Sequence, residues 1–62
     1  SKIEGELEKS QKTLIKLIQK KFGIDEFEIS FIKDCKDIDK LDNALEEFVF
    51  SNHKEKILDL LK

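Results

Sequence analysis

The chain has 62 residues, of which 39% are hydrophobic and 42% charged, with no proline, two glycines and one cysteine. This length allows one domain, and the composition is too apolar and too periodic for disorder, so we expect an all-helical chain. A lone cysteine excludes an internal disulfide, and no apolar run approaches the roughly 20 residues that span a membrane; with no visible signal peptide, we expect a cytoplasmic protein that does not bind membranes.

Charge is unevenly distributed along the chain, although the formal net charge is only −2. Residues 1–22 carry six lysines and three glutamates, whereas residues 23–62 carry six lysines and eleven acidic residues. A chain with this distribution can associate head to tail. It lacks the overall basic balance of a nucleic-acid binder.

The first expected helix covers residues 2–22, where apolar positions recur with a helical period. They form an arc wide enough for one contact inside the domain and another with a second chain. Gly23 suits the left-handed position after a helix end, and Lys20 and Lys21 complement the negative end of the helix dipole. The arc consists of Ile3, Leu7, Leu14, Ile15, Leu17, Ile18 and Phe22.

A second, shorter helix is expected to begin after Asp25 and to end near Asp34 or Cys35. Asp25 and Glu28 have the spacing of a capping box, in which each side chain accepts a hydrogen bond from the other residue's backbone N–H.

Two more short helices are expected toward the C-terminus. Asp37 is the predicted N-cap of a helix over residues 38–50. Asn52 and Glu55 again have capping-box spacing and predict a last helix that begins at Asn52. Residues 1–62 should therefore form a single all-α domain, a small bundle of one long amphipathic helix followed by three short helices. We expect the internal core to contain Phe22, Phe27, Phe31, Leu41, Leu45 and Phe48.

Cys35 and His53 are the candidate nucleophile and base, but the sequence does not support catalysis by this pair. The two lie 18 residues apart, and no glycine-rich oxyanion turn accompanies either. Two such residues also fit no zinc signature. We therefore predict no catalytic residue, no metal ligand and no cofactor, with Cys35 packed at a helix end and His53 facing solvent.

A stripe of lysines lies opposite the apolar arc of the first helix, at about 100° per residue. Such a stripe could bind a phosphate backbone without sequence preference. The chain has no arginine, no aromatic residue interrupts the stripe, and three glutamates share the helix. A solvated helix back is therefore favoured, and an auxiliary nucleic-acid-binding module is the alternative function. Its contacts would be Lys9, Lys12, Lys16 and Lys20.

The run LIKLIQKKFG at residues 14–23 resembles the LLxLLxxRFG signature that opens the C-terminal domain of the recombination-promoting nuclease / putative transposase family. Residues 25–32 resemble the second helix of that domain, and residues 37–41 and 51–58 resemble segments of its later helices. The similarity covers nearly the whole chain. Lys21 departs from the arginine that usually precedes Phe-Gly.

The resemblance implies a bacterial, non-catalytic domain that is the C-terminal part, or a separately made short form, of a longer protein. Its preceding PD-(D/E)xK domain would be a metal-dependent DNA nuclease. In such families an isolated tail can pair with the full-length enzyme and restrain it, in the manner of an antitoxin. We thus expect a homodimer that also pairs with its parent nuclease. The predicted subunit contact, at the wide arc of the first helix, is Ile3, Leu7, Leu14, Ile15 and Leu17.

Overall fold

The computed structural model describes the backbone of residues 2–62 and the side chains of residues 5–62. Within this part of the chain the structure is helical and contains no strand, which confirms the predicted bundle of one long and three short helices. The helices are α1 (Lys2–Lys21), α2 (Glu26–Asp34), α3 (Ile38–Phe50) and α4 (Lys54–Asp59).

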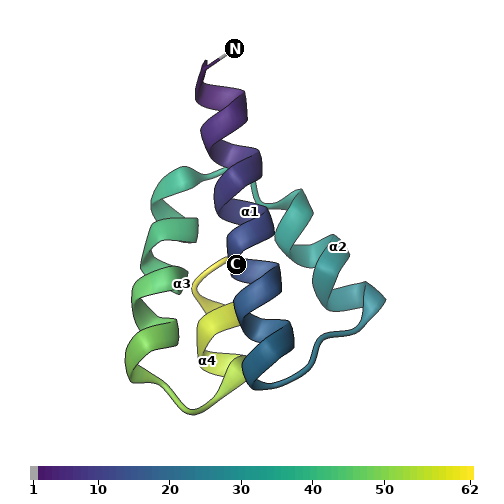
Figure 1. The fold of residues 1–62 in the computed structure, drawn as a ribbon. Coiled ribbons are helices and arrows are strands. Elements are labelled where there is room, and N and C mark those ends of the chain that lie inside the picture. The colour runs from purple at the N-terminus through teal and green to yellow at the C-terminus, as the bar shows by residue number, and fades with distance from the viewer. Residues whose placement is uncertain (1) are drawn as a thin grey trace.

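The long helix α1 is the axis of the bundle. Helices α2 and α3 pack along opposite sides of α1, and α4 packs against α3 (Figure 1). The first turns of α1 extend beyond the other three helices (Figure 1). The short helices therefore gather around the C-terminal part of α1, and this is where the core lies.

The core is small, and every helix contributes to it. Its largest fully buried side chains are Leu14 and Ile18 of α1, Ile32 of α2, Leu41 of α3 and Ile57 of α4. Burial of each such side chain stabilises the fold by about 1.5–3 kcal/mol. Each short helix contributes one of these large residues, and smaller or partly buried side chains such as Ala44 and Leu58 add to the core.

The turn after α1 has the predicted left-handed glycine. Gly23 has a φ of 86°, and its N–H donates to the carbonyl oxygens of Ile18 at 3.0 Å and Gln19 at 3.1 Å. The Ile18 carbonyl also accepts from the Phe22 N–H at 2.8 Å, so these bonds close the last turn of α1. The chain then reverses direction into α2.

Two of the predicted caps are present. The Glu28 backbone N–H donates to Asp25 Oδ1 at 2.8 Å, and the Asp25 N–H donates to Glu28 Oε1 at 3.1 Å. Asp37 Oδ1 accepts from the backbone N–H groups of Asp39 at 3.0 Å and Lys40 at 3.3 Å. The capping box before α2 and the N-cap of α3 are therefore confirmed.

The predicted start of the last helix is wrong. Helix α4 begins after His53, whose side chain makes no capping bond, and not at Asn52. The connection is instead shaped by Ser51, a buried residue whose Oγ accepts from the His53 N–H at 3.1 Å. This local serine turn extends the connection past Asn52.

The core prediction is wrong for α2. Phe27 is 88% exposed and Phe31 37% exposed, whereas Ile32 is fully buried. At about 100° per residue, the apolar positions of α2 cover an arc wider than one neighbouring helix can bury. Leu41 is buried as predicted, and Phe22, Leu45 and Phe48 are half-buried and pack against the core.

The two glycines of the chain provide a matched test of the turn after α1. A Cβ added at either glycine would meet no atom within 4 Å, so packing does not distinguish them. Gly23→Ala should destabilise the fold by about 1–2 kcal/mol, because an L-residue is strained at positive φ. Gly5→Ala lies within α1 and should be neutral or stabilising by up to about 1 kcal/mol. Denaturant unfolding of both variants measures this, and a change of the same sign in both would contradict it.

Candidate interaction surface

Cys35 and His53 are separated by the full length of α3. Cys35 is buried at the C-terminus of α2, just before α3, and His53 follows α3. Helix α3 has 13 residues and spans about 20 Å. Cys35 Sγ faces the carbonyl oxygen of Asp37 at 3.8 Å, which agrees with its predicted packing at a helix end, and His53 is exposed as expected. This geometry does not form a nucleophile–base pair.

Metal-ligating side chains also remain dispersed. Among the described residues, no three His, Cys, Asp or Glu side chains come together in a way that could hold a metal ion. The described residues do provide polar cross-links between helices, exposed apolar groups and exposed lysines.

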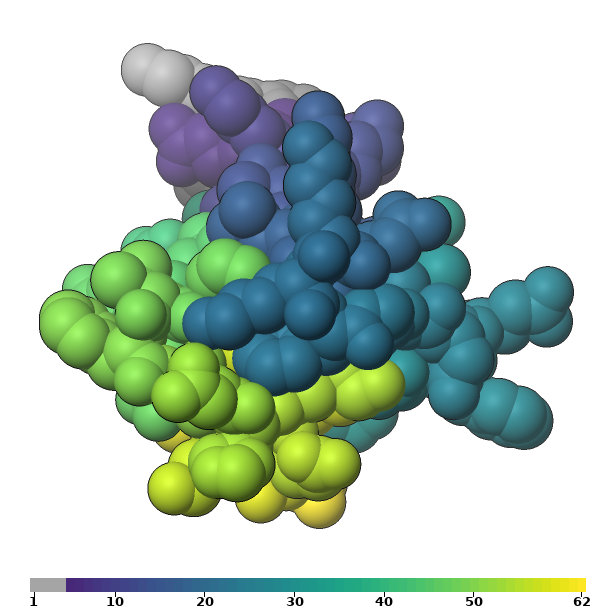
Figure 2. Space-filling view, turned by 60° about the horizontal axis from the view of Figure 1, so that its bottom comes forward, coloured from purple at the N-terminus to yellow at the C-terminus, as the bar shows by residue number. Residues whose placement is uncertain are grey.

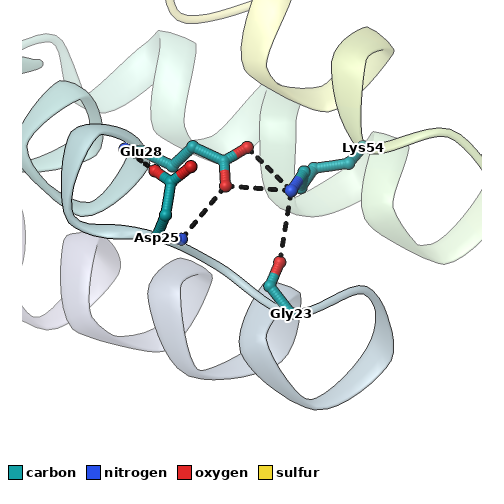
Figure 3. Close-up of polar contacts among 4 residues, drawn as sticks. All are labelled: Gly23, Asp25, Glu28 and Lys54. Carbon is teal, nitrogen blue, oxygen red and sulfur yellow. Dashed lines mark hydrogen bonds and ion pairs between the residues drawn. The ribbon is translucent and has the colours of Figure 1, made fainter.

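Lys54 ties the start of α4 to the corner between α1 and α2. Its Nζ donates to Glu28 Oε1 at 2.9 Å and to the Gly23 carbonyl oxygen at 3.3 Å, and it lies 2.8 Å from Glu28 Oε2 (Figure 3). Glu28 is also the partner of Asp25 in the capping box. One carboxylate thus joins the first turn of α2 to α4.

The pKa of Lys54 is raised above the ordinary lysine value of 10.5. The main cause is the hydrogen bond to Glu28, and the negative charges of Glu28, Asp25 and Glu55 add to it, while partial burial acts in the opposite direction. The ammonium form is therefore favoured by folding. The contact is fully formed below the ordinary lysine pKa.

Two residues of α1 make similar links to the ends of other helices. Gln11 is buried, and its Nε2 donates to the carbonyl oxygens of Lys33 at 3.1 Å and Cys35 at 2.7 Å, at the end of α2. Lys21 Nζ donates to the Ser51 carbonyl oxygen at 3.1 Å, at the end of α3. The sequence pattern contains a signal for Gln11, since it is a polar residue in the middle of the apolar arc, between Leu7 and Leu14.

An apolar groove lies between α2 and α4. It encloses about 310 Å³, and three apolar side chains form its surface: Phe27, Phe31 and Leu58. Glu28, Glu55, Asp59 and Lys62 form its rim. The groove does not follow from the sequence, because the i, i+4 spacing of Phe27 and Phe31 on a helix is compatible with a core position or a surface position.

A second apolar patch lies at the end of α3, where Val49 is 71% exposed and Phe50 83% exposed. Neither residue lines the α2/α4 groove. Among residues 5–62, the α2/α4 groove and the end of α3 are thus separate surfaces on which large apolar side chains face solvent.

The subunit contact predicted on α1 is largely used inside the chain. Leu14 is fully buried in the core, so it offers no surface to a second chain. Leu7 and Ile15 are half-buried and pack against the core, and Leu17 is half-buried. The side chain of Ile3 lies outside the described part of the structure. Of the four described residues, only Leu17 does not pack in or against the core cluster.

The lysine stripe of α1 is exposed over its whole length. Among residues 5–62, none of its four ammonium groups forms an ion pair. Its members remain Lys9, Lys12, Lys16 and Lys20.

Comparison with known proteins gives no relative for this chain. No protein-family model, curated protein or solved structure matches it. Among residues 2–62, no helix has the length and apolar character required to cross a membrane.

The Lys54 contact predicts a pH dependence of stability. Because folding raises the pKa of Lys54, its contribution is present below pH 10.5 and is lost as the pH rises through the raised pKa. Lys54→Gln should lower the thermal midpoint at neutral pH, and the difference from the wild type should shrink in strong alkali. Lys56→Gln, on the exposed side of α4, is the control. An unchanged difference between Lys54→Gln and the wild type across this range would contradict the prediction.

Proposed function

We propose that this chain is a non-catalytic interaction domain that pairs with itself, and with a parent nuclease in the manner the family resemblance implies. The exposure of Val49 and Phe50, which are adjacent in the chain of so small a domain, is the observation that carries the proposal. Large apolar side chains cost little when scattered singly, but gathered patches are typical of protein–protein contacts. The small core adds to this, because pairing supplies burial that a short chain lacks.

Of the two apolar surfaces, the Val49–Phe50 patch at the end of α3 is the better candidate for self-pairing. A symmetric contact brings the same patch of two chains together, so charges around it meet like charges. Val49 and Phe50 are followed by the uncharged Ser51 and Asn52. The α2/α4 groove, by contrast, has three carboxylates on its rim. Glu46 is exposed one turn earlier on α3, so two Val49–Phe50 patches that approach from the loop side bring together fewer carboxylates than two grooves.

Pairing also supports a regulatory role. A domain that pairs with itself and is repeated in a longer chain can form mixed pairs with that chain, and an isolated copy then competes with pairing of the parent. This is the physical basis on which an antitoxin-like inhibitor would act. The proposed partners are therefore a second copy of this chain and the full-length nuclease, with no cofactor.

Sedimentation velocity over a range of micromolar concentrations tests self-pairing. The wild type should sediment as a dimer, and a strict monomer would contradict the proposal. Val49→Glu with Phe50→Glu should weaken pairing by at least about tenfold, because burial of one phenylalanine contributes about 1.5–3 kcal/mol. Both residues are exposed in the single chain, so helicity should be retained.

Two variants on α1 complete this test. Gln19→Glu adds a charge to an exposed position of α1 and should leave the dimer intact. Leu17→Glu tests the contact first expected on α1. If Leu17→Glu dissociates the dimer and the α3 double variant does not, pairing uses α1 and the assignment to α3 is wrong.

A second candidate function is binding of nucleic acid by the lysine stripe, and the exposure of all four lysines favours it. Contacts to phosphate would weaken steeply with salt and would show no sequence preference. A gel shift with a short duplex at low and physiological salt measures this. Changing Lys12 and Lys16 to Gln should abolish a true shift, whereas Lys56→Gln on α4 should not. The absence of a shift at low salt would remove this candidate.

A further inference from the structure

The α2/α4 groove has the chemistry of a docking site for a partner other than a second copy of this chain. Its apolar surface is formed by Phe27 and Phe31 of α2 and by Leu58, which packs against the core from α4. Side chains of α2 stand out from the body of the molecule on this side (Figure 2). Phe27 is 88% exposed, so its side chain contributes nothing to the stability of the single chain through burial.

The volume of the groove does not by itself select the class of partner, but the spacing of its apolar side chains matches a helix. Its volume of about 310 Å³ lies at the lower end of the roughly 300–1,000 Å³ of small-molecule pockets. Phe27 and Phe31 lie one helical turn apart, about 6 Å along the axis of α2. A partner helix presents apolar side chains at i and i+4 with the same repeat, as in known helix-in-groove complexes. Residues 2–62 offer no strand edge to which an extended partner could add.

The charges on the rim of the groove indicate which charge a partner should carry. Glu28, Glu55 and Asp59 contribute three carboxylates, and Lys62 one ammonium group. Glu28 is paired with Lys54, and Asp59 with Lys62 at 3.0 Å. The second pair is mostly exposed, so its contribution is small and a partner can replace it.

Glu55 makes the strongest case for a basic partner. It is exposed and forms no ion pair within residues 5–62. A lysine or arginine beside the apolar residues of a partner helix would therefore find a free carboxylate at Glu55 and a second one, only weakly held, at Asp59. Two grooves placed against each other would instead bring these carboxylates together.

We propose that the α2/α4 groove binds a basic amphipathic helix of another protein. Two apolar side chains one turn apart on that helix would fill the space between Phe27, Phe31 and Leu58. Lysine or arginine residues beside them would meet Glu55 and Asp59. This surface is separate from the Val49–Phe50 patch, so the inference stands or fails independently of self-pairing.

The test uses the full chain and a labelled synthetic helix with two leucines at i and i+4 flanked by lysines. Fluorescence anisotropy should show saturable binding that weakens as salt is raised. Two control peptides separate the components: one has glutamates in place of the lysines, and the other has serines in place of the leucines. The peptide with serines should bind at least about tenfold more weakly, as for the loss of central anchors in an interface. The peptide with glutamates should bind more weakly at low salt, because its charges are repelled by Glu55 and Asp59. Equal binding of either control peptide would overturn the proposal.

Variants of the chain locate the site. Phe27→Ser should reduce binding of the basic helix by at least about tenfold, and Phe27→Leu should restore much of it. Glu55→Lys should reduce binding and its salt dependence, whereas Glu46→Lys, on the exposed face of α3, should not. Circular dichroism should show unchanged helicity, because Phe27 and Glu55 are both exposed.

Two further results distinguish this proposal from a site at the end of α3 and from binding of an extended segment. Phe50→Ser should leave helix binding unchanged even where it disrupts self-pairing. If Phe50→Ser abolishes helix binding and Phe27→Ser does not, the site is at the end of α3 and the proposal is wrong. A proline-rich peptide with the same charge should not compete; effective competition would show that the groove binds an extended segment and would also overturn the proposal.

Discussion

The amount of core available to four helices is the constraint on which the rest of this structure depends. Five fully buried large side chains hold the bundle together, and α2, α3 and α4 contribute one each. Because α2 packs mainly against α1, its wide apolar arc cannot be covered by the chain itself. The exposed phenylalanine that results is a direct consequence of too little covering surface. The same shortage that limits stability therefore creates the candidate docking surface.

Long polar side chains compensate for the small core by joining helix ends. Gln11 reaches the end of α2, Lys21 the end of α3, and Lys54 joins α4 to the start of α2. Lys21 Nζ also lies 5.4 Å and 5.0 Å from the ring centroids of Phe22 and Phe48, within the range of cation–π attraction. The two rings meet edge to face, with centroids 6.2 Å apart. Gln11 and Lys21 donate to backbone carbonyls at helix ends, and Lys54 donates to the Glu28 carboxylate and the Gly23 carbonyl.

Local signals in the sequence were sufficient for the helices and most of their ends. Gly23, the Asp25–Glu28 box and the Asp37 cap act within a few residues, so spacing alone predicts them. The faces of the helices were harder, because periodicity shows that α2 has an apolar arc but not which part of it α1 covers. Phe27 was therefore assigned to the core, and the groove was missed. Contacts such as Gln11 with Cys35 join residues 24 positions apart and depend on how the helices cross.

The groove depends on the contacts of Lys54 with Glu28 and Gly23, because they hold α4 against the rest of the bundle. Helix α4 has six residues, too few to be helical in isolation, and it forms one wall of the groove through Leu58. Detachment of α4 from Glu28 and Gly23 would therefore remove the Leu58 wall of the groove. By mass action, a helix bound in the groove must in turn hold α4 in place. A helix bound in the groove would thus slow hydrogen exchange in α4, which lies across the groove from Phe27 and Phe31.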